Sequence, residues 1–401
     1  MNVDVKKLQA MLDASLESIA YRQDRYPTGG IVESDVRFDN GFVYGKGKTC
    51  YPRNVLAEPL VFFGMADRLR RSIEFWRLCQ DTDGSWGGSY FIDKPEPCRG
   101  RGKLQTDTTG YVLHHCFVYY NHSKDKNWLN EHWDMIEKGA DYLTSLINDE
   151  FGMIPGNEEA IIREEYGEID WPEGYHAHIN SACERGLRVA AKMAQDIDKQ
   201  TQARKYLTAA DTIKYNIFQR LWDDNDKRML FGINLRGEPY RAAMWFSLMP
   251  WYLNCTWDEK AHSTFYYLWD KFYDKDPLIR HSYWSNDFTE LAEGRESYHS
   301  RYSGAGPYIG VSAAIAEMLL WDGNEKLAED QINLITQYTD ESNLICEHIN
   351  TLHPGSEGSL KVYPEKPYAV DRGNGMHMSF FLHLAIELCK RGIIEKPTNA
   401  Y

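Results

Sequence analysis

The sequence lacks the short motifs that mark several large enzyme classes. No Gly-x-Gly-x-x-Gly segment follows a strand-like run, and neither a Walker loop nor a His-Glu-x-x-His pair occurs. The acidic run at 223–226 resembles a calcium loop, but it lacks the central glycine and the closing glutamate. These absences argue against dinucleotide, P-loop and zinc-peptidase chemistry, and we predict neither a cofactor nor a metal.

Long apolar runs and cysteine motifs are also missing. No stretch approaches the ~18 apolar residues of a membrane-spanning helix. Residues 1–7 lead into an amphipathic pattern without the apolar core of a secretion signal. The 8 cysteines include no Cys-x-x-Cys pair. We therefore expect a cytoplasmic protein with no membrane partner, whose cysteines are reduced and buried.

Positive charge is scarce, because 45 Lys and Arg stand against 59 Asp and Glu, a net charge of -14 over 401 residues. Nucleic acid binding relies on clustered basic residues, so nucleic acid is not expected as a partner. Aromatic residues, in contrast, make up 13% of the chain, with 12 Trp and 26 Tyr. Most of these rings must pack in the core, but flat amphipathic rings also stack on sugars. The composition is therefore compatible with a carbohydrate partner and does not by itself require one.

Helical patterns, with apolar residues three and four positions apart, dominate the chain and come in pairs. Long links rich in glycine, proline and aromatics, at 81–103, 151–175, 277–307 and 342–375, alternate with short ones. In a ring of helical hairpins, alternate links fall on one face, so the long links would surround one mouth. No segment resembles an interdomain linker, and we predict one catalytic domain, 1–401. The predicted helices span 5–21, 55–79, 109–120, 128–147, 177–194, 202–221, 243–253, 259–272, 309–320, 326–339 and 376–390.

Two glutamates suit the cleavage of a glycosidic bond, which needs one protonated carboxyl and one carboxylate. Glu173 lies between aromatic residues just before an apolar helix, and an apolar wall would raise its pKa and keep it protonated. It could equally be a charge favoured by the helix dipole. Glu347 lies in an apolar run, where a carboxylate must be either hydrogen-bonded for structural reasons or functional. The residues alone leave these alternatives open.

Several segments, in the right order along the chain, resemble the glucoamylase-type glycosidases. Leu344-Ile-Cys-Glu347, the loop after it and the helix at 376–390 are similar to the region of that family's base glutamate. Segments 83–90 and 105–113 resemble its loop and the helix start that follows, and Trp171-Pro-Glu173 resembles its Trp-Glu acid motif. The resemblance implies an all-α fold, the (α/α)6 toroid of six-hairpin glycosidases with long loops on one face. It also implies Glu347 as general base and Glu173 as general acid.

The chain departs from the family pattern in two places. The family has Pro-Arg-Asp where this chain has Pro-Arg53-Asn54, so an amide replaces the carboxylate that holds the terminal sugar, and the sugar, anomer and linkage are left open. Pro172 separates the acid from its tryptophan, which leaves Asp170 and Glu168 as substitutes. The predicted substrate-binding residues, for each of which simple packing is the alternative, are Arg53, Asn54, Trp86, Tyr90, Asp107, Trp171, Tyr175, His176 and His377, with His178 as a further orienting group.

The leading hypothesis is an inverting, exo-acting glycoside hydrolase, which predicts catalytic carboxyls about 6.5–9.5 Å apart, whereas about 5 Å would indicate retention. A sugar epimerase of the acylglucosamine epimerase type shares the toroid and uses histidines, which keeps His176, His178, His348 and His377 in view. A sugar-binding relative without catalytic activity is the third hypothesis, prompted by Asn54. Retained glutamates at both positions favour the enzyme.

Overall fold

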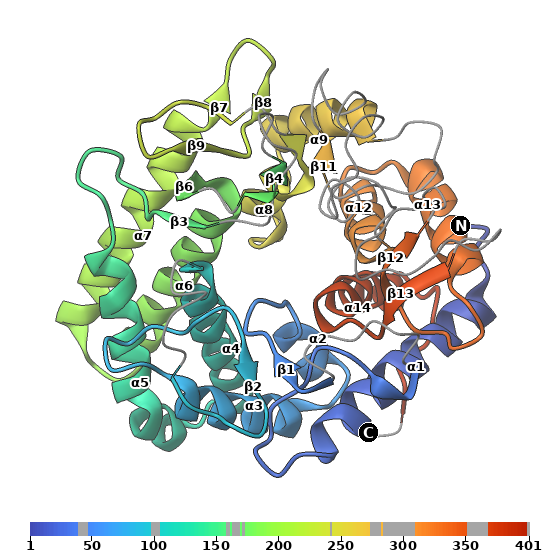
Figure 1. The fold of residues 1–401 in the computed structure, drawn as a ribbon, viewed down its shortest axis with the longest axis horizontal. Helices are drawn as coiled ribbons and strands as arrows, with labels where there is room; N and C mark the ends of the chain where they lie inside the picture. The colour runs from blue at the N-terminus through green and yellow to red at the C-terminus, as the bar shows by residue number, and fades with distance from the viewer. Residues whose placement is uncertain are drawn as a thin grey trace.

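The computed structural model describes residues 1–38, 47–97, 105–157, 161–162, 169–170, 173–240, 243–272, 282–283, 309–350 and 368–398, with only the backbone for some strand residues, 347–350 among them. In these ranges the α-helices form a closed ring with an inner and an outer layer (Figure 1). The inner helices are α2 (Ala57–Phe62), α4 (Asp107–Ser123), α6 (Ala177–Asp196), α8 (Met249–Tyr252), α12 (Ile309–Trp321) and α14 (Gly375–Lys390). The outer helices are α1 (Val5–Asp24), α3 (Ala66–Cys79), α5 (Lys126–Ser145), α7 (Gln200–Arg220), α9 (Glu259–Phe272) and α13 (Glu325–Tyr338).

The order of the helices explains the alternation of long and short links. Each inner helix from α2 to α12 is followed at once by its outer neighbour, as in the short turn from α4 to α5. Each outer helix is joined to the next inner helix by a long link, so all long links approach the N-terminal ends of the inner helices. The last inner helix, α14, packs against α1 and closes the ring.

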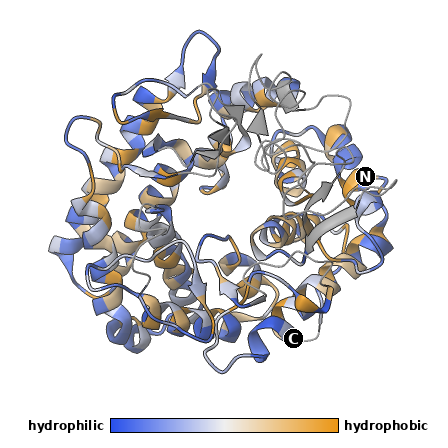
Figure 2. Ribbon diagram, viewed as in Figure 1, coloured by the Kyte–Doolittle hydropathy of each residue, from blue (hydrophilic) through white to orange (hydrophobic). Residues whose placement is uncertain are grey.

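The inner and outer helices bury different fractions of their residues, in agreement with their apolar patterns. Nearly every residue of α12 is buried, which suits its almost continuous apolar sequence. The outer helix α5 buries one stripe that includes Trp128 and Leu143, and the Asp125 side chain caps its N-terminus by accepting from two backbone N–H groups. Figure 2 shows hydrophobic residues along α12 and α14, with hydrophilic residues on the outside of the ring.

The strands are short and lie in the long links. They pair as β1 (Thr49–Cys50) with β2 (Tyr90–Phe91), β4 (Ile161–Ile162) with β5 (Ile169–Asp170), β7 (Trp222–Asp223) with β8 (Arg228–Met229), β10 (Ala243–Met244) with β11 (Ser282–Tyr283), and β12 (Cys346–Asn350) with β13 (Tyr368–Arg372). β3 (Gly156–Asn157), β6 (Glu173–His176) and β9 (Gly232–Asn234) form a three-stranded sheet. All of these pairs are antiparallel. Short antiparallel strand pairs thus shape the face onto which the long links open.

Two helix predictions were wrong in detail. The segment 55–79 forms two helices, because Gly64 adopts a φ of 81° and turns the chain between α2 and α3. The segment 243–253 forms a strand, the 3-10 helix η3 (Trp245–Leu248) and the single turn of α8 rather than one long helix.

Most of the cysteine prediction fits the structure. Among the described cysteines no disulfide is present, but Cys255 is exposed, which corrects the expectation that all are buried. No helix of the described ranges has both the length and the apolarity that crossing a bilayer requires.

Candidate active site

The first turns of the inner helices bring together residues that are far apart in the sequence. Arg53 precedes α2, Asp107 opens α4 and His178 lies in the first turn of α6. Arg53 Nε lies 2.6 Å from Asp107 Oδ2, and these side chains are only 6% and 0% exposed. His178 Nε2 lies 3.8 Å from the same oxygen and 2.8 Å from the Tyr111 hydroxyl. A buried ion pair at this position neutralises its own charge and fixes both side chains.

Asn54 follows Arg53 and uses both ends of its amide within its own turn. Its Nδ2 donates to the Tyr51 carbonyl at 2.9 Å, and its Oδ1 accepts from the Leu56 amide at 3.1 Å. An aspartate could accept the second bond but could not donate the first. The structure therefore gives Asn54 a role in forming the entry to α2, whereas the sequence predicted it only as a substrate-binding residue.

Three of the aromatic and imidazole candidates lie in the core. Trp86 is 1% exposed and donates from Nε1 to the Trp76 carbonyl at 2.8 Å. Tyr175 is buried and stacks on Phe151, with ring centroids 4.6 Å apart. His176 is fully buried. Rings enclosed in this way cannot stack on a sugar without rearrangement, which corrects the prediction of stacking platforms at Trp86 and Tyr175.

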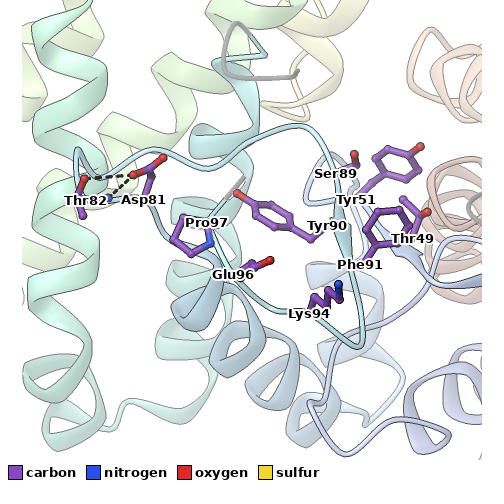
Figure 3. A pocket seen from close by; sticks show the side chains of 10 residues that line it. All are labelled: Thr49, Tyr51, Asp81, Thr82, Ser89, Tyr90, Phe91, Lys94, Glu96 and Pro97. Atoms are coloured by element: carbon purple, nitrogen blue, oxygen red, sulfur yellow. Dashed lines mark hydrogen bonds between the residues drawn. The ribbon is translucent and has the colours of Figure 1, made fainter. Parts of the chain in front are cut away.

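His377 and Tyr90 are also largely buried. His377 lies in the first turn of α14, where its backbone N–H donates to the capping side chain of Asn374 at 3.0 Å. The Tyr90 hydroxyl accepts from the Gly87 amide at 2.5 Å, and its ring lines the pocket shown in Figure 3. Trp171 lies outside the described residues.

The two candidate catalytic glutamates lie on strands in different long links. Glu173 opens β6, its side chain is exposed, and its carbonyl accepts from the Tyr240 hydroxyl at 2.9 Å. The strand β6 separates it from α6, so it does not directly precede the helix. Glu347 is the second residue of β12, whose backbone alone is described there. The strands β6 and β12 lie on opposite sides of the ring axis (Figure 1).

A buried network holds β13, and hence its partner β12, against the first outer helix. Arg22 of α1 donates from Nη1 to the carbonyls of Val32, Glu33 and Gly373 at 2.7–2.9 Å. Gly373 follows β13 directly, and the Glu33 carboxylate accepts from the Met376 amide at 2.8 Å. Burial raises the pKa of Glu33 to about 7. The seam that closes the ring therefore also fixes the hairpin that carries Glu347.

Deeper in the ring lies an ionisable cluster that the sequence did not single out. The Glu58 carboxylate accepts from His114 Nε2 at 2.6 Å and forms an ion pair with Arg185, while His383 Nε2 lies 3.9 Å away. These four residues, which we call the ring-core cluster, come from α2, α4, α6 and α14. Burial disfavours the ionised carboxylate, but its contacts with His114 and Arg185 outweigh that cost and hold the pKa of Glu58 well below its usual range.

Burial acts on the neighbouring groups as well. It lowers the pKa of His383, and it lowers the pKa of His115 to about 4. Burial also raises the pKa of Glu317, which accepts from the Tyr252 hydroxyl at 3.0 Å, to about 8. Adjacent histidines in an otherwise apolar helix were the only signal in the sequence that could have revealed this polar core. Among the described residues, no group of three or more His, Cys, Asp or Glu could hold a metal ion.

Comparisons with known proteins agree with the ring. A glycosidase variant of known structure superposes with a TM-score of 0.70 over 98% of both chains, at 16% identity. The glucoamylase from Saccharomycopsis fibuligera gives 0.66 over 96% of this chain and 94% of its own, at 12% identity. A bacterial glucoamylase complexed with acarbose gives 0.65 over 96% of this chain and 56% of its own, at 14% identity. The chain has the glucoamylase-like fold. The predicted (α/α)6 toroid is thus confirmed.

Sequence comparison gives weaker evidence of relationship than the structural comparison does. An uncharacterized glycosyl hydrolase of Methanocaldococcus jannaschii is 24% identical over 208 residues, which are 51% of this chain and 30% of that protein. The match thus spans less than a third of the relative's length. No family model matches the sequence.

Proposed function

We propose that the chain is a glycoside hydrolase, a single catalytic domain that releases the terminal sugar of a neutral oligosaccharide or glycoside with inversion. Glu347 would deprotonate the attacking water, and Glu173 would protonate the leaving oxygen. The observation that carries the proposal is the position of the two glutamates, which lie on strands of separate long links across the axis of a glucoamylase-like ring. An inverting mechanism needs two carboxyls on opposite faces of the sugar.

The relatives support this chemistry through what their names state. The matched archaeal relative is named a glycosyl hydrolase, and a further variant of the superposed glycosidase was solved in complex with glucose. Arg53 precedes α2 and Asp107 opens α4, and together they would form the base of the site. On this proposal the bound sugar covers the exposed carboxyl of Glu173.

Histidine burial favours a hydrolase over an epimerase. A proton-transfer histidine must reach the substrate carbon, but His176 and His178 are fully buried and His377 is 5% exposed. The side chain of His348, the fourth candidate, lies outside the described part of the chain. His178 is bonded to Tyr111 and lies next to the Arg53–Asp107 pair, which suits a structural role. An epimerase would also release no new reducing end, so product analysis separates the two functions.

The test is hydrolysis of neutral aryl glycosides and oligosaccharides by Glu173→Gln, Glu347→Gln and Asp170→Asn. We expect Glu347→Gln to lower kcat by roughly 10²–10⁴-fold on every substrate, the usual contribution of a general base. Glu173→Gln should lose as much on oligosaccharides but far less on aryl glycosides whose leaving group needs no proton. Glu131→Gln, at an exposed carboxylate of α5, is the matched control. Near wild-type activity in either glutamate variant would reject its role, and a loss in Asp170→Asn alone would move the acid to that residue.

A further inference from the structure

The end of the ring that carries the long links has a concave feature among the described residues. A pocket of about 780 Å³ lies along the β1–β2 strand pair and the link from α3 to α4, and we call it the rim pocket. Its volume falls within the range of about 300–1,000 Å³ that is usual for small-molecule sites. Asp81 lies near one end of the pocket and Tyr51 near the other, with Tyr90 between them (Figure 3).

The lining of the rim pocket suits a sugar. Phe91 is one of its walls and is 55% exposed, which is unusual for so large an apolar ring. Tyr51 adds a second ring, and hydroxyl and carboxylate side chains also line the pocket, among them Ser89 and Glu96. Aromatic faces next to hydroxyl-binding groups match the alternating apolar and polar surface of a pyranose.

The pocket is built on a rigid base. Tyr90 is held by its bond from the Gly87 amide, and the backbone of Trp86 is bonded to the side chains of Thr108 and Thr109 at 2.5 and 3.3 Å. The end of the Gln105 side chain lies directly against Gly88, so the link approaches the start of α4 closely there. A preformed wall loses little conformational entropy when a ligand binds.

The charged side chains that line the rim pocket disfavour an acidic ligand and suit a neutral one. The charged side chains that line the pocket are Asp81, Glu96 and Lys94, which gives an excess of one negative charge (two minus one). The whole chain carries a net charge of -14, so acidic glycans are repelled at long range as well.

We infer that the rim pocket holds a distal sugar unit of a neutral oligosaccharide whose terminal sugar occupies the central site. Tyr51 connects the rim pocket with the central site along the chain. It lines the rim pocket and lies two residues before Arg53, which pairs with Asp107. An exo-acting enzyme leaves the rest of its substrate outside the central site, and the rim pocket lies on the face where that remainder emerges. The inference rests on the proposed function.

The experiment measures binding and hydrolysis separately. Binding of neutral gluco-oligosaccharides of two to six units, with α-1,4 or β-1,4 linkages, is followed by titration calorimetry in the Glu347→Gln background, which prevents cleavage during the titration. Phe91 is left intact or changed by Phe91→Ala or Phe91→Tyr, and hydrolysis is measured with Glu347 present. We expect Phe91→Ala to weaken the binding of the longer oligosaccharides roughly tenfold, a loss that corresponds to about 1.4 kcal/mol of contact. Glucose binding should not change, and Phe91→Tyr should restore the affinity. Tyr215→Ala, which removes a 64% exposed ring from α7, is the matched control and should have no effect.

The outcomes separate this inference from the proposed function. Three results would overturn the proposed role of the rim pocket: unchanged affinity in Phe91→Ala, an equal loss in Tyr215→Ala, or no binding of any neutral oligosaccharide in the series. None of them decides whether the protein hydrolyses glycosides, which the glutamate variants test. Binding that depends on Phe91 without hydrolysis of any substrate would reject the enzyme and retain the pocket. Because Phe91 is largely exposed, the variant should keep the wild-type thermal midpoint, which is measured alongside.

Discussion

The ring-core cluster makes a quantitative prediction about stability. Glu58→Gln keeps the shape of the side chain but removes the negative charge, leaving Arg185 deep in the ring without its counter-charge. Removing one partner of a buried ion pair costs about 3–5 kcal/mol. The Glu58 side chain is 28% exposed, so water partly solvates the site and reduces that cost. We therefore expect the free energy of unfolding to fall by about 2–4 kcal/mol.

The assay is equilibrium unfolding in urea at pH 7, with circular dichroism as the signal. Asp134→Asn breaks the Lys138–Asp134 pair, which has a similar 2.7 Å contact but lies on the surface with side chains 52% and 79% exposed. It should cost at most about 1 kcal/mol. The double variant Glu58→Gln/Arg185→Gln should lose less than the sum of its single variants, because neither charge is then left unpaired. A loss below about 1 kcal/mol in Glu58→Gln, equal to that of the surface control, would refute the reasoning.

Three further predictions follow from buried groups. Glu317 has a folded pKa of about 8, above its unfolded value, so its contribution to stability is full below about pH 4.5 and is lost as the pH rises toward 8. Glu317→Gln should abolish this loss, which is measured as the difference in the free energy of unfolding between pH 5 and pH 8. Gly110→Ala would place a Cβ 2.2 Å from the Ala182 carbonyl oxygen where α4 meets α6, and should lower the free energy of unfolding by about 1–3 kcal/mol, measured in urea. Asp107→Asn removes the carboxylate of the buried pair with Arg53, so it should cost about 3–5 kcal/mol of stability, and under our proposal it should also raise KM for the natural substrate.

Much of the fold could be predicted because helix periodicity is a local property. The predicted segment 259–272 coincides with α9, and the segment 309–320 differs from α12 by one residue. The pattern failed where apolar spacing continued across a break in the backbone. Gly64, whose φ is positive, ends α2 while the spacing runs on into α3. Periodicity reports which side chains face the core, and it does not report where the chain turns.

Less of the candidate site could be predicted, because burial and pairing depend on distant parts of the chain. Arg53 and Asp107 were singled out separately, and only the ring brings them into contact. Trp86 stands in a glycine-rich link that is typical of a surface loop, yet it is buried. Glu58 stands at the start of a helix, where a surface charge is favoured by the helix dipole, so its place inside the ring left no signal in the sequence.

The most direct test of the account is the configuration of the first product. Hydrolysis of a neutral glycoside is followed by proton NMR of the anomeric signals, within the first minutes, before mutarotation mixes the anomers. If Glu347 and Glu173 act as base and acid, the free sugar appears first as the anomer opposite to that of the substrate, in agreement with carboxyls about 6.5–9.5 Å apart. Release of the same anomer would contradict the mechanism, and the absence of any new reducing end would contradict the assignment as a hydrolase.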